Sequence, residues 1–179
     1  MNRSIYFLPG RGSSFQGRLG TELQARGCEI SGRVLEGEFA KLPFPDQINL
    51  IADDLAKYSE QQIPLIAHSF GAYLGLRAIL QNKSYGGKVL LISPILGAVK
   101  GNGRMFKPPQ SKRIAEVIEA RQFPKLDVAL LVGDQDWQSP LVECENLVLV
   151  TDGKFHIAKG KGHDLGKKTV GLFLTHFLN

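Results

Sequence analysis

Short apolar runs alternate with amphipathic segments along most of the chain. Runs rich in Ile, Val, Leu and Phe stand at residues 4–8, 63–67, 88–93 and 126–132. We predict that each is a β-strand, and the last two have the apolar pattern of strands buried on both faces. A weaker strand is predicted over EISGRVL, residues 29–35.

The segments between these runs have helical periodicity. In the segment that begins at Pro43, Ile48, Ile51 and Leu55 fall on one helical face, and Pro45 and Asp46 are typical of a helix start. Helices are predicted for residues 15–26, 43–62, 71–81, 111–122 and 167–179.

Two stretches are predicted to lack this alternation. Residues 97–109 contain three glycines and two prolines, which indicates a loop. In NLVLVTDGKFHIA, residues 146–158, Asp152-Gly153 separates two runs of high β-propensity and predicts a β-hairpin.

The alternation of strands and helices predicts an α/β fold. We expect a three-layer α/β/α sandwich over residues 1–179, with one domain and a mostly parallel sheet of about six strands. Ligands of such sheets bind in loops beyond the carboxyl ends of the strands, which is where the glycine-rich turns of this chain fall.

The composition is that of an ordinary globular protein, with 43% hydrophobic and 22% charged residues. The sequence shows neither a run long enough to cross a membrane nor the pattern of a secretory leader, so we expect no membrane insertion. With Cys28 and Cys144 as its cysteines, the chain has no disulfide framework, and a cytoplasmic location is expected.

The net charge of +5 raises the possibility of a nucleic-acid partner. The lysines and arginines are scattered, with one local cluster between Lys100 and Arg113, and no nucleic-acid-binding motif is present. We therefore expect no nucleic-acid partner. The cluster either attracts an anionic substrate or is a solvated surface.

The sequence AHSFG, residues 67–71, connects a predicted strand directly to a predicted helix. A turn this tight requires small residues two before and two after the serine, which Ala67 and Gly71 provide. It would expose the Ser69 hydroxyl and leave the Phe70 N–H free to bind an oxyanion. Ser69 is therefore a candidate nucleophile; alternatively, it simply caps the helix.

This turn resembles the Gly-x-Ser-x-Gly nucleophile elbow of the α/β-hydrolase superfamily, with Ala67 in place of the first glycine. That superfamily orders its catalytic residues as serine, acid and histidine. The resemblance assigns the acid to Asp136, in the Gly-x-x-Asp turn after a strand, with Asp134 as the alternative. It assigns the base to His163, in a Gly-His loop before the last helix.

The resemblance also assigns a second oxyanion donor. The PGRGSSF segment resembles the superfamily's His-Gly-x-Gly loop, with Pro9 in place of the histidine, and places Gly10 and the Arg11 N–H at the oxyanion hole. The first strand corresponds to the superfamily's third, so the two leading antiparallel strands are absent. Residues 97–125 leave little room for a cap domain.

The implied activity is hydrolysis of a small acyl ester or thioester through an acyl-enzyme on Ser69, without a metal or organic cofactor. Phe15 and Trp137 are candidate substrate-binding residues, as is Gly10. The remaining histidines, His68, His156 and His176, are expected to lie outside the catalytic site.

Two other functions stay open. The fold could bind a ligand or partner without catalysis. Alternatively, Gly10-x-Gly12 after the first strand could form a dinucleotide loop, with Glu36 or Glu38 binding the ribose. The second reading leaves Ser69, Asp136 and His163 unexplained.

Overall fold

The computed structural model describes residues 3–82 and 85–178. Its main feature is a six-stranded, fully parallel sheet in the order β2-β1-β3-β4-β7-β8. The strands are β1 (Arg3–Leu8), β2 (Cys28–Gly32), β3 (Leu65–His68), β4 (Val89–Ile92), β7 (Val128–Gly133) and β8 (Lys154–Ala158). The prediction of a mostly parallel sheet is confirmed.

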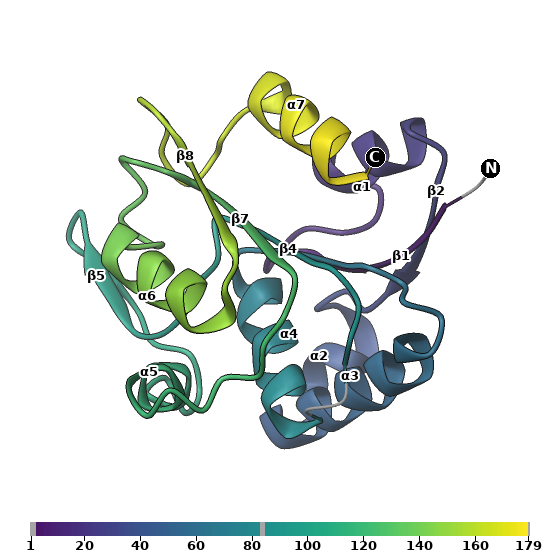
Figure 1. Cartoon of the computed structure of the whole chain (residues 1–179), viewed down its shortest axis with the longest axis horizontal. Helices are drawn as coiled ribbons and strands as arrows, with labels where there is room; N and C mark the ends of the chain where they lie inside the picture. The colour runs from purple at the N-terminus through teal and green to yellow at the C-terminus, as the bar shows by residue number, and fades with distance from the viewer. Residues whose placement is uncertain (1–2, 83–84, 179) are drawn as a thin grey trace.

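Helices cover both faces of this sheet and complete the three layers (Figure 1). One face packs against α1 (Arg18–Ala25) and α7 (Lys167–Leu178). The other packs against the larger group of α2 (Gly37–Lys41), α3 (Phe44–Ser59), α4 (Phe70–Gln81), α5 (Arg113–Glu119) and α6 (Leu141–Thr151).

Alternation along each strand divides the core between these two layers. In β3, Leu65 and Ala67 point into the core beneath α3 and α4, whereas Ile66 points into the core beneath α1 and α7. All three side chains are fully buried. Because the central strands are apolar on both faces, they form the middle layer, as expected of parallel strands.

The predicted hairpin at Asp152-Gly153 is wrong. Residues 141–151 form α6, which buries Cys144, Leu147, Val148 and Thr151 on one side. Asp152 has a left-handed backbone (φ +58°) and ends the helix, and the Gly153 N–H donates to the Val148 carbonyl. An Asp-Gly pair supplies the left-handed residue that a helix end needs as readily as it forms a hairpin turn.

The predicted loop over 97–109 instead contains a hairpin. Strands β5 (Val99–Gly101) and β6 (Arg104–Phe106) pair antiparallel. They are joined by Asn102 and Gly103, whose φ angles of +51° and +70° are both left-handed. This is the two-residue turn that an Asn-Gly pair favours. The short helix α2 was also not predicted.

Within the described ranges, the structure has no helix that is both long and apolar enough to cross a bilayer.

Candidate active site

Ser69 lies in the sharp turn between β3 and α4, with φ +54° and ψ −121°. A serine rarely adopts this backbone conformation, which persists only where the surrounding structure enforces it. Gly71 is part of that structure, because a Cβ atom there would lie 2.2 Å from the Leu8 carbonyl oxygen. The end of β1 therefore packs directly against the first turn of α4.

The Ser69 hydroxyl bonds to the His163 imidazole. Although Ser69 is the N-cap residue of α4, its side chain makes no capping hydrogen bond. Instead, its Oγ lies 2.8 Å from His163 Nε2. The helix-cap interpretation of this serine is therefore not supported by the geometry.

Asp136 binds the opposite side of the same imidazole. His163 Nδ1 lies 2.9 Å from Asp136 Oδ2 and 3.1 Å from Oδ1. The structure thus brings serine, histidine and aspartate from three loops into one hydrogen-bonded chain at the carboxyl edge of the sheet. Serine and histidine are 94 residues apart in sequence.

The environment of Asp136 stabilises its charged form. Burial by itself would raise the pKa of this carboxyl, but the hydrogen bond and charge of His163 and the Gln138 N–H together hold the pKa below its ordinary value. Asp134, the alternative acid, is exposed and instead accepts the Gly160 N–H at 2.7 Å. It stabilises the loop that leads to His163.

The two predicted oxyanion donors belong to segments that adjoin the serine, the first turn of α4 and the loop after β1. A Cβ atom on Gly10 would be 3.1 Å from Ser69 Cβ, so the loop after β1 packs against the nucleophile candidate. Within residues 3–82 and 85–178, no protein acceptor bonds the backbone N–H of Phe70 or of Arg11. Both groups are therefore available to a ligand.

His68 was expected to lie outside the catalytic site, but it lies next to the hydrogen-bonded chain. Its ring centroid is 5.7 Å from that of His163, and a Cβ on Gly10 would lie 3.0 Å from its Nδ1. Burial, followed by the nearby His163, lowers the pKa of His68 to about 4. Strand alternation could have revealed this position, because His68 shares the α1/α7 face of β3 with Ile66.

A pocket of about 170 Å³ adjoins both histidines on this side of the sheet. Its walls include the apolar side chains of Leu19, Ile92, Leu165 and Val170. The Arg18–Asp164 ion pair, 2.7 Å long and exposed, also lines it. An apolar pocket beside the imidazole can hold a small nonpolar group.

Ser93 is a second residue at the site that was not predicted from the sequence. It follows β4, is fully buried and has a left-handed backbone (φ +43°). Its hydroxyl donates to the His163 carbonyl oxygen at 3.1 Å, and its N–H donates to the Leu131 carbonyl. Ser93 thus ties the histidine loop to the centre of the sheet.

The two remaining candidate substrate-binding residues, Phe15 and Trp137, lie in different surroundings. Phe15 packs on Phe7, with 6.1 Å between ring centroids, in the core beneath α1 and α7. Trp137 is half-buried against the β5–β6 hairpin, where a Cβ on Gly101 would approach its ring to 2.9 Å.

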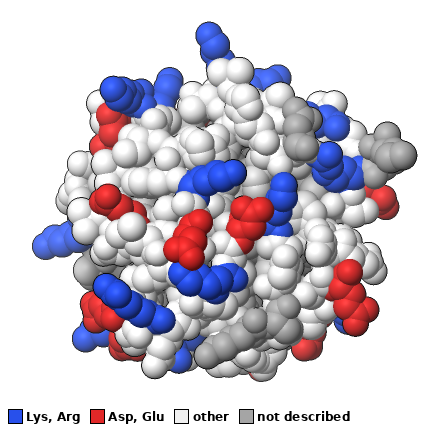
Figure 2. Space-filling model, in the orientation of Figure 1, with Lys and Arg blue, Asp and Glu red and all other residues white. Residues whose placement is uncertain are grey.

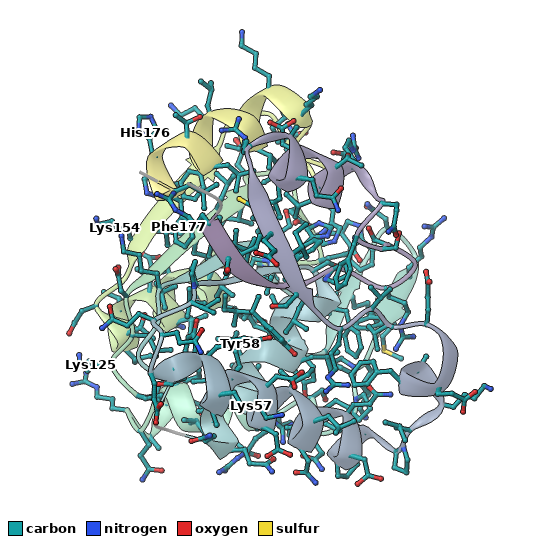
Figure 3. The ribbon with its side chains drawn as sticks, turned by 90° about the vertical axis from the view of Figure 1, so that its right-hand side faces the viewer. Lys57, Tyr58, Lys125, Lys154, His176 and Phe177 are labelled. Atoms are coloured by element: carbon teal, nitrogen blue, oxygen red, sulfur yellow. The ribbon has the colours of Figure 1, made fainter. Side chains whose placement is uncertain are left out.

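The last two histidines lie away from the hydrogen-bonded chain. His156, on β8, packs edge-on against Phe173 with 4.6 Å between centroids. His176 lines a separate pocket of about 270 Å³ with Lys154 and Phe177, whose side chains Figure 3 labels. That pocket includes the residues just before β4 and β7, so it lies at the amino edge of the sheet.

Among the described residues, no group of three or more His, Cys, Asp or Glu side chains is arranged to hold a metal ion.

No protein-family model matches the chain, and no curated protein sequence matches it significantly. Solved structures do. Alpha/beta hydrolase domain-containing protein 10 from mouse superposes with a TM-score of 0.74 at 15% identity, over 98% of this chain and 87% of that one. A monoacylglycerol lipase from Paleococcus ferrophilus gives 0.72 at 15% identity, over 98% and 93%.

Est1E from Butyrivibrio proteoclasticus gives a TM-score of 0.69 at 15% identity, covering 99% of this chain and 87% of that chain. At these identities the likeness concerns the fold. It agrees with the mostly parallel six-stranded sheet that helices cover on both faces. This chain therefore has an α/β-hydrolase fold.

Proposed function

We propose that the protein is a serine hydrolase that cleaves carboxylic esters or thioesters through an acyl-enzyme on Ser69. The observation that carries this proposal is the hydrogen-bonded chain from Ser69 Oγ through His163 to a buried aspartate, at 2.8 Å and 2.9 Å. A serine hydroxyl is a weak nucleophile at neutral pH and needs an adjacent, oriented base. This arrangement supplies both.

In the first half of the reaction, His163 Nε2 takes the Ser69 proton while Oγ bonds to the ester carbonyl carbon. The imidazolium then gives the proton to the leaving oxygen or sulfur as its bond to carbon breaks. In the second half, the imidazole takes a proton from water, whose oxygen bonds to the acyl carbon. Ser69 recovers its proton as the acid departs.

Asp136 serves the base throughout this cycle. By accepting from Nδ1, the carboxylate fixes the tautomer that leaves Nε2 free to accept the serine proton, and it stabilises the imidazolium that forms. Its lowered pKa keeps it charged at neutral pH. Ser93, by bonding the His163 carbonyl, maintains the position of the base.

The oxyanion of the tetrahedral intermediate needs donors fixed in advance of the reaction. We assign these to the backbone N–H groups of Phe70 and Arg11. The Phe70 N–H is a free donor at the start of α4, where the helix dipole also favours negative charge. The close packing of Gly10 against Ser69 supports the second assignment.

The structural neighbours, which include a monoacylglycerol lipase and a thioesterase domain, support this class of reaction. The pocket of about 170 Å³ beside His163 is smaller than the roughly 300–1,000 Å³ of typical ligand pockets. It suits a short apolar acyl or alcohol group.

Kinetics on 4-nitrophenyl butyrate test the assignment of roles. Ser69→Ala, His163→Ala and Asp136→Asn are each expected to lower kcat/KM at least about 1,000-fold, because the three side chains act as a unit. Asp134→Asn is the matched control for Asp136→Asn, since the asparagine oxygen still accepts the Gly160 N–H. We expect it to retain activity within about threefold.

The proposal is wrong if Ser69→Ala, with its fold verified by circular dichroism, keeps more than a tenth of the wild-type activity. Equal losses in Asp134→Asn and Asp136→Asn would overturn the assignment of the acid.

A further inference from the structure

The Arg11 side chain lies on the ring of Phe70, the residue that follows the candidate nucleophile. Its guanidinium carbon lies 4.8 Å from the centre of the Phe70 ring and 5.5 Å from that of Phe106. The two rings meet edge to face, with centroids 5.6 Å apart. Because Phe70 directly follows Ser69, these cation–π contacts keep a positive charge close to the serine.

The β5–β6 hairpin contacts both the serine turn and the acid loop. Phe106, at the end of β6, packs on Phe70 of the nucleophile turn. Gly101, at the end of β5, packs on Trp137, the neighbour of Asp136. The hairpin therefore spans from the serine turn to the acid loop. It and the residue after it carry three exposed cations, namely Lys100, Arg104 and Lys107.

In the part of the chain that the structure describes, these cations form no ion pair with a carboxylate. The sequence has no Asp or Glu before Glu22, and none between Glu60 and Glu116. Eight lysines and arginines fall in the second interval. Within residues 3–82 and 85–178, no ion pair involves Arg11, Lys100, Arg104 or Lys107. On the other side of His163, by contrast, Arg18 is paired with Asp164.

Surface cations usually serve solubility and are free to move in solvent. Arg11 differs, because two aromatic rings fix its planar guanidinium while leaving the side chain exposed. A guanidinium held in place loses little conformational entropy when it binds a carboxylate, and its planar shape matches the carboxylate's two oxygens. The exposed guanidinium is therefore free to bind an anion brought by a substrate.

We propose that the preferred substrate is an ester whose acyl part carries a second, free carboxylate, bound by the Arg11 guanidinium while Ser69 attacks the ester carbonyl. This substrate class, the half-esters of short dicarboxylic acids, rests on the proposed function of Ser69. The cations of the hairpin add a positive field that attracts the substrate without a fixed contact.

Two esters of equal carbon number test the proposal, 4-nitrophenyl hydrogen adipate and 4-nitrophenyl hexanoate, with uncatalysed hydrolysis subtracted. The measured quantity is the ratio of their kcat/KM values, adipate over hexanoate. We expect Arg11→Gln to lower this ratio about tenfold, as for the loss of one charge-assisted contact. Arg11→Lys keeps the charge and is expected to keep most of the ratio.

Arg3→Gln is the matched control, because it removes the same charge from the opposite end of β1, where the side chain is also exposed. Its ratio should stay within about twofold of the wild type. Raising the NaCl concentration should lower the wild-type ratio and have little effect on that of Arg11→Gln, since screening acts on the charged substrate.

The inference is overturned if both esters are hydrolysed and Arg11→Gln leaves the ratio within twofold, or if Arg3→Gln lowers it equally. If the wild-type protein hydrolyses neither ester, the proposed function fails, and the substrate class fails with it.

Discussion

The backbone conformation of Ser69 depends on a neighbour that has no side chain. The Leu8 and Pro9 carbonyl oxygens would lie 2.2 Å and 2.5 Å from a Cβ at position 71. Both are backbone atoms of the segment that ends β1, so they cannot turn aside as a flexible side chain can. The glycine therefore allows β1 and the nucleophile turn to approach each other.

This contact predicts a large effect from a single methyl group. Gly71→Ala is expected to lower the free energy of unfolding by about 3 kcal/mol, because the overlap forces the strand and the helix apart. Gly75→Ala is the comparison, since its Cβ would meet only the ends of leucine side chains at 3.2 Å. We expect that variant to stay within about 1 kcal/mol of the wild type in urea unfolding.

Equal stability of the Gly71→Ala protein and the wild type would contradict the packing described for this turn.

The lowered pKa of His68 predicts how the free energy of unfolding changes with pH. Because its pKa falls from 6.5 to about 4 on folding, the unfolded chain binds more protons than the native chain between these values. The free energy of unfolding therefore decreases as the pH falls from about 6.5 to about 4. Between pH 7 and pH 5 this one residue accounts for on the order of 1–2 kcal/mol.

Urea unfolding at the two pH values measures this loss. His68→Gln should reduce the pH dependence by that amount, whereas His176→Gln, which changes an exposed side chain on α7, should leave it as in the wild type. A pH dependence that is the same in His68→Gln and the wild type would show that the His68 imidazole is not the cause.

At the level of elements, two similar dipeptides formed different structures. Asp152-Gly153 ends α6, and Asn102-Gly103 turns the β5–β6 hairpin. Both pairs favour left-handed backbone, which helix ends and hairpin turns share. The local sequence identifies a chain reversal, but whether the preceding residues become helix or strand depends on what they pack against.

The contribution of the left-handed turn to the stability of the hairpin is testable. Gly103→Val should destabilise the hairpin by about 1–2 kcal/mol, because a branched residue is strained at φ +70° even though no atom lies within 4 Å of its Cβ. The measurement is the rate of limited proteolysis within residues 97–109, which should rise. Gly86→Ala, exposed and without a left-handed φ, is the control expected to leave that rate unchanged.

Unchanged cleavage of the hairpin in Gly103→Val would mean that the turn does not determine its order.

The central elements were predictable because their signals agree. The apolar strands at 88–93 and 126–132 each pair with a strand on both sides, and the helix after Ser69 begins one residue before its predicted start. That Ser69, Asp136 and His163 would meet was predictable, because their loops follow strands and preserve a known order. The position of Ser93 was not, because it depends on which loops meet across the sheet.

Over the whole molecule, the parallel sheet explains how distant residues meet. The loops after β3, β7 and β8 all leave the same edge, so residues 69, 136 and 163 converge without any long insertion. Asp136 Oδ1 also accepts the Gln138 N–H at 2.9 Å, which holds the carboxylate in its own loop.

The net charge of +5 is not gathered on one broad surface of the face seen in Figure 2, where acidic and basic side chains are mixed. The unpaired cations near the candidate active site belong to two short segments, the loop after β1 and the β5–β6 hairpin. The net charge of the molecule is therefore less informative about the substrate than the positions of these few side chains.

The central claim is that Ser69 is an activated nucleophile. A fluorophosphonate probe tests it most directly, because the phosphorus bonds to a serine oxygen only where a base and an oxyanion site activate it. After reaction with the folded protein and digestion, mass spectrometry should find the adduct on Ser69. The adduct should be absent from the Ser69→Ala protein and strongly reduced in His163→Ala. An unlabelled Ser69 in the folded wild-type protein would contradict the account.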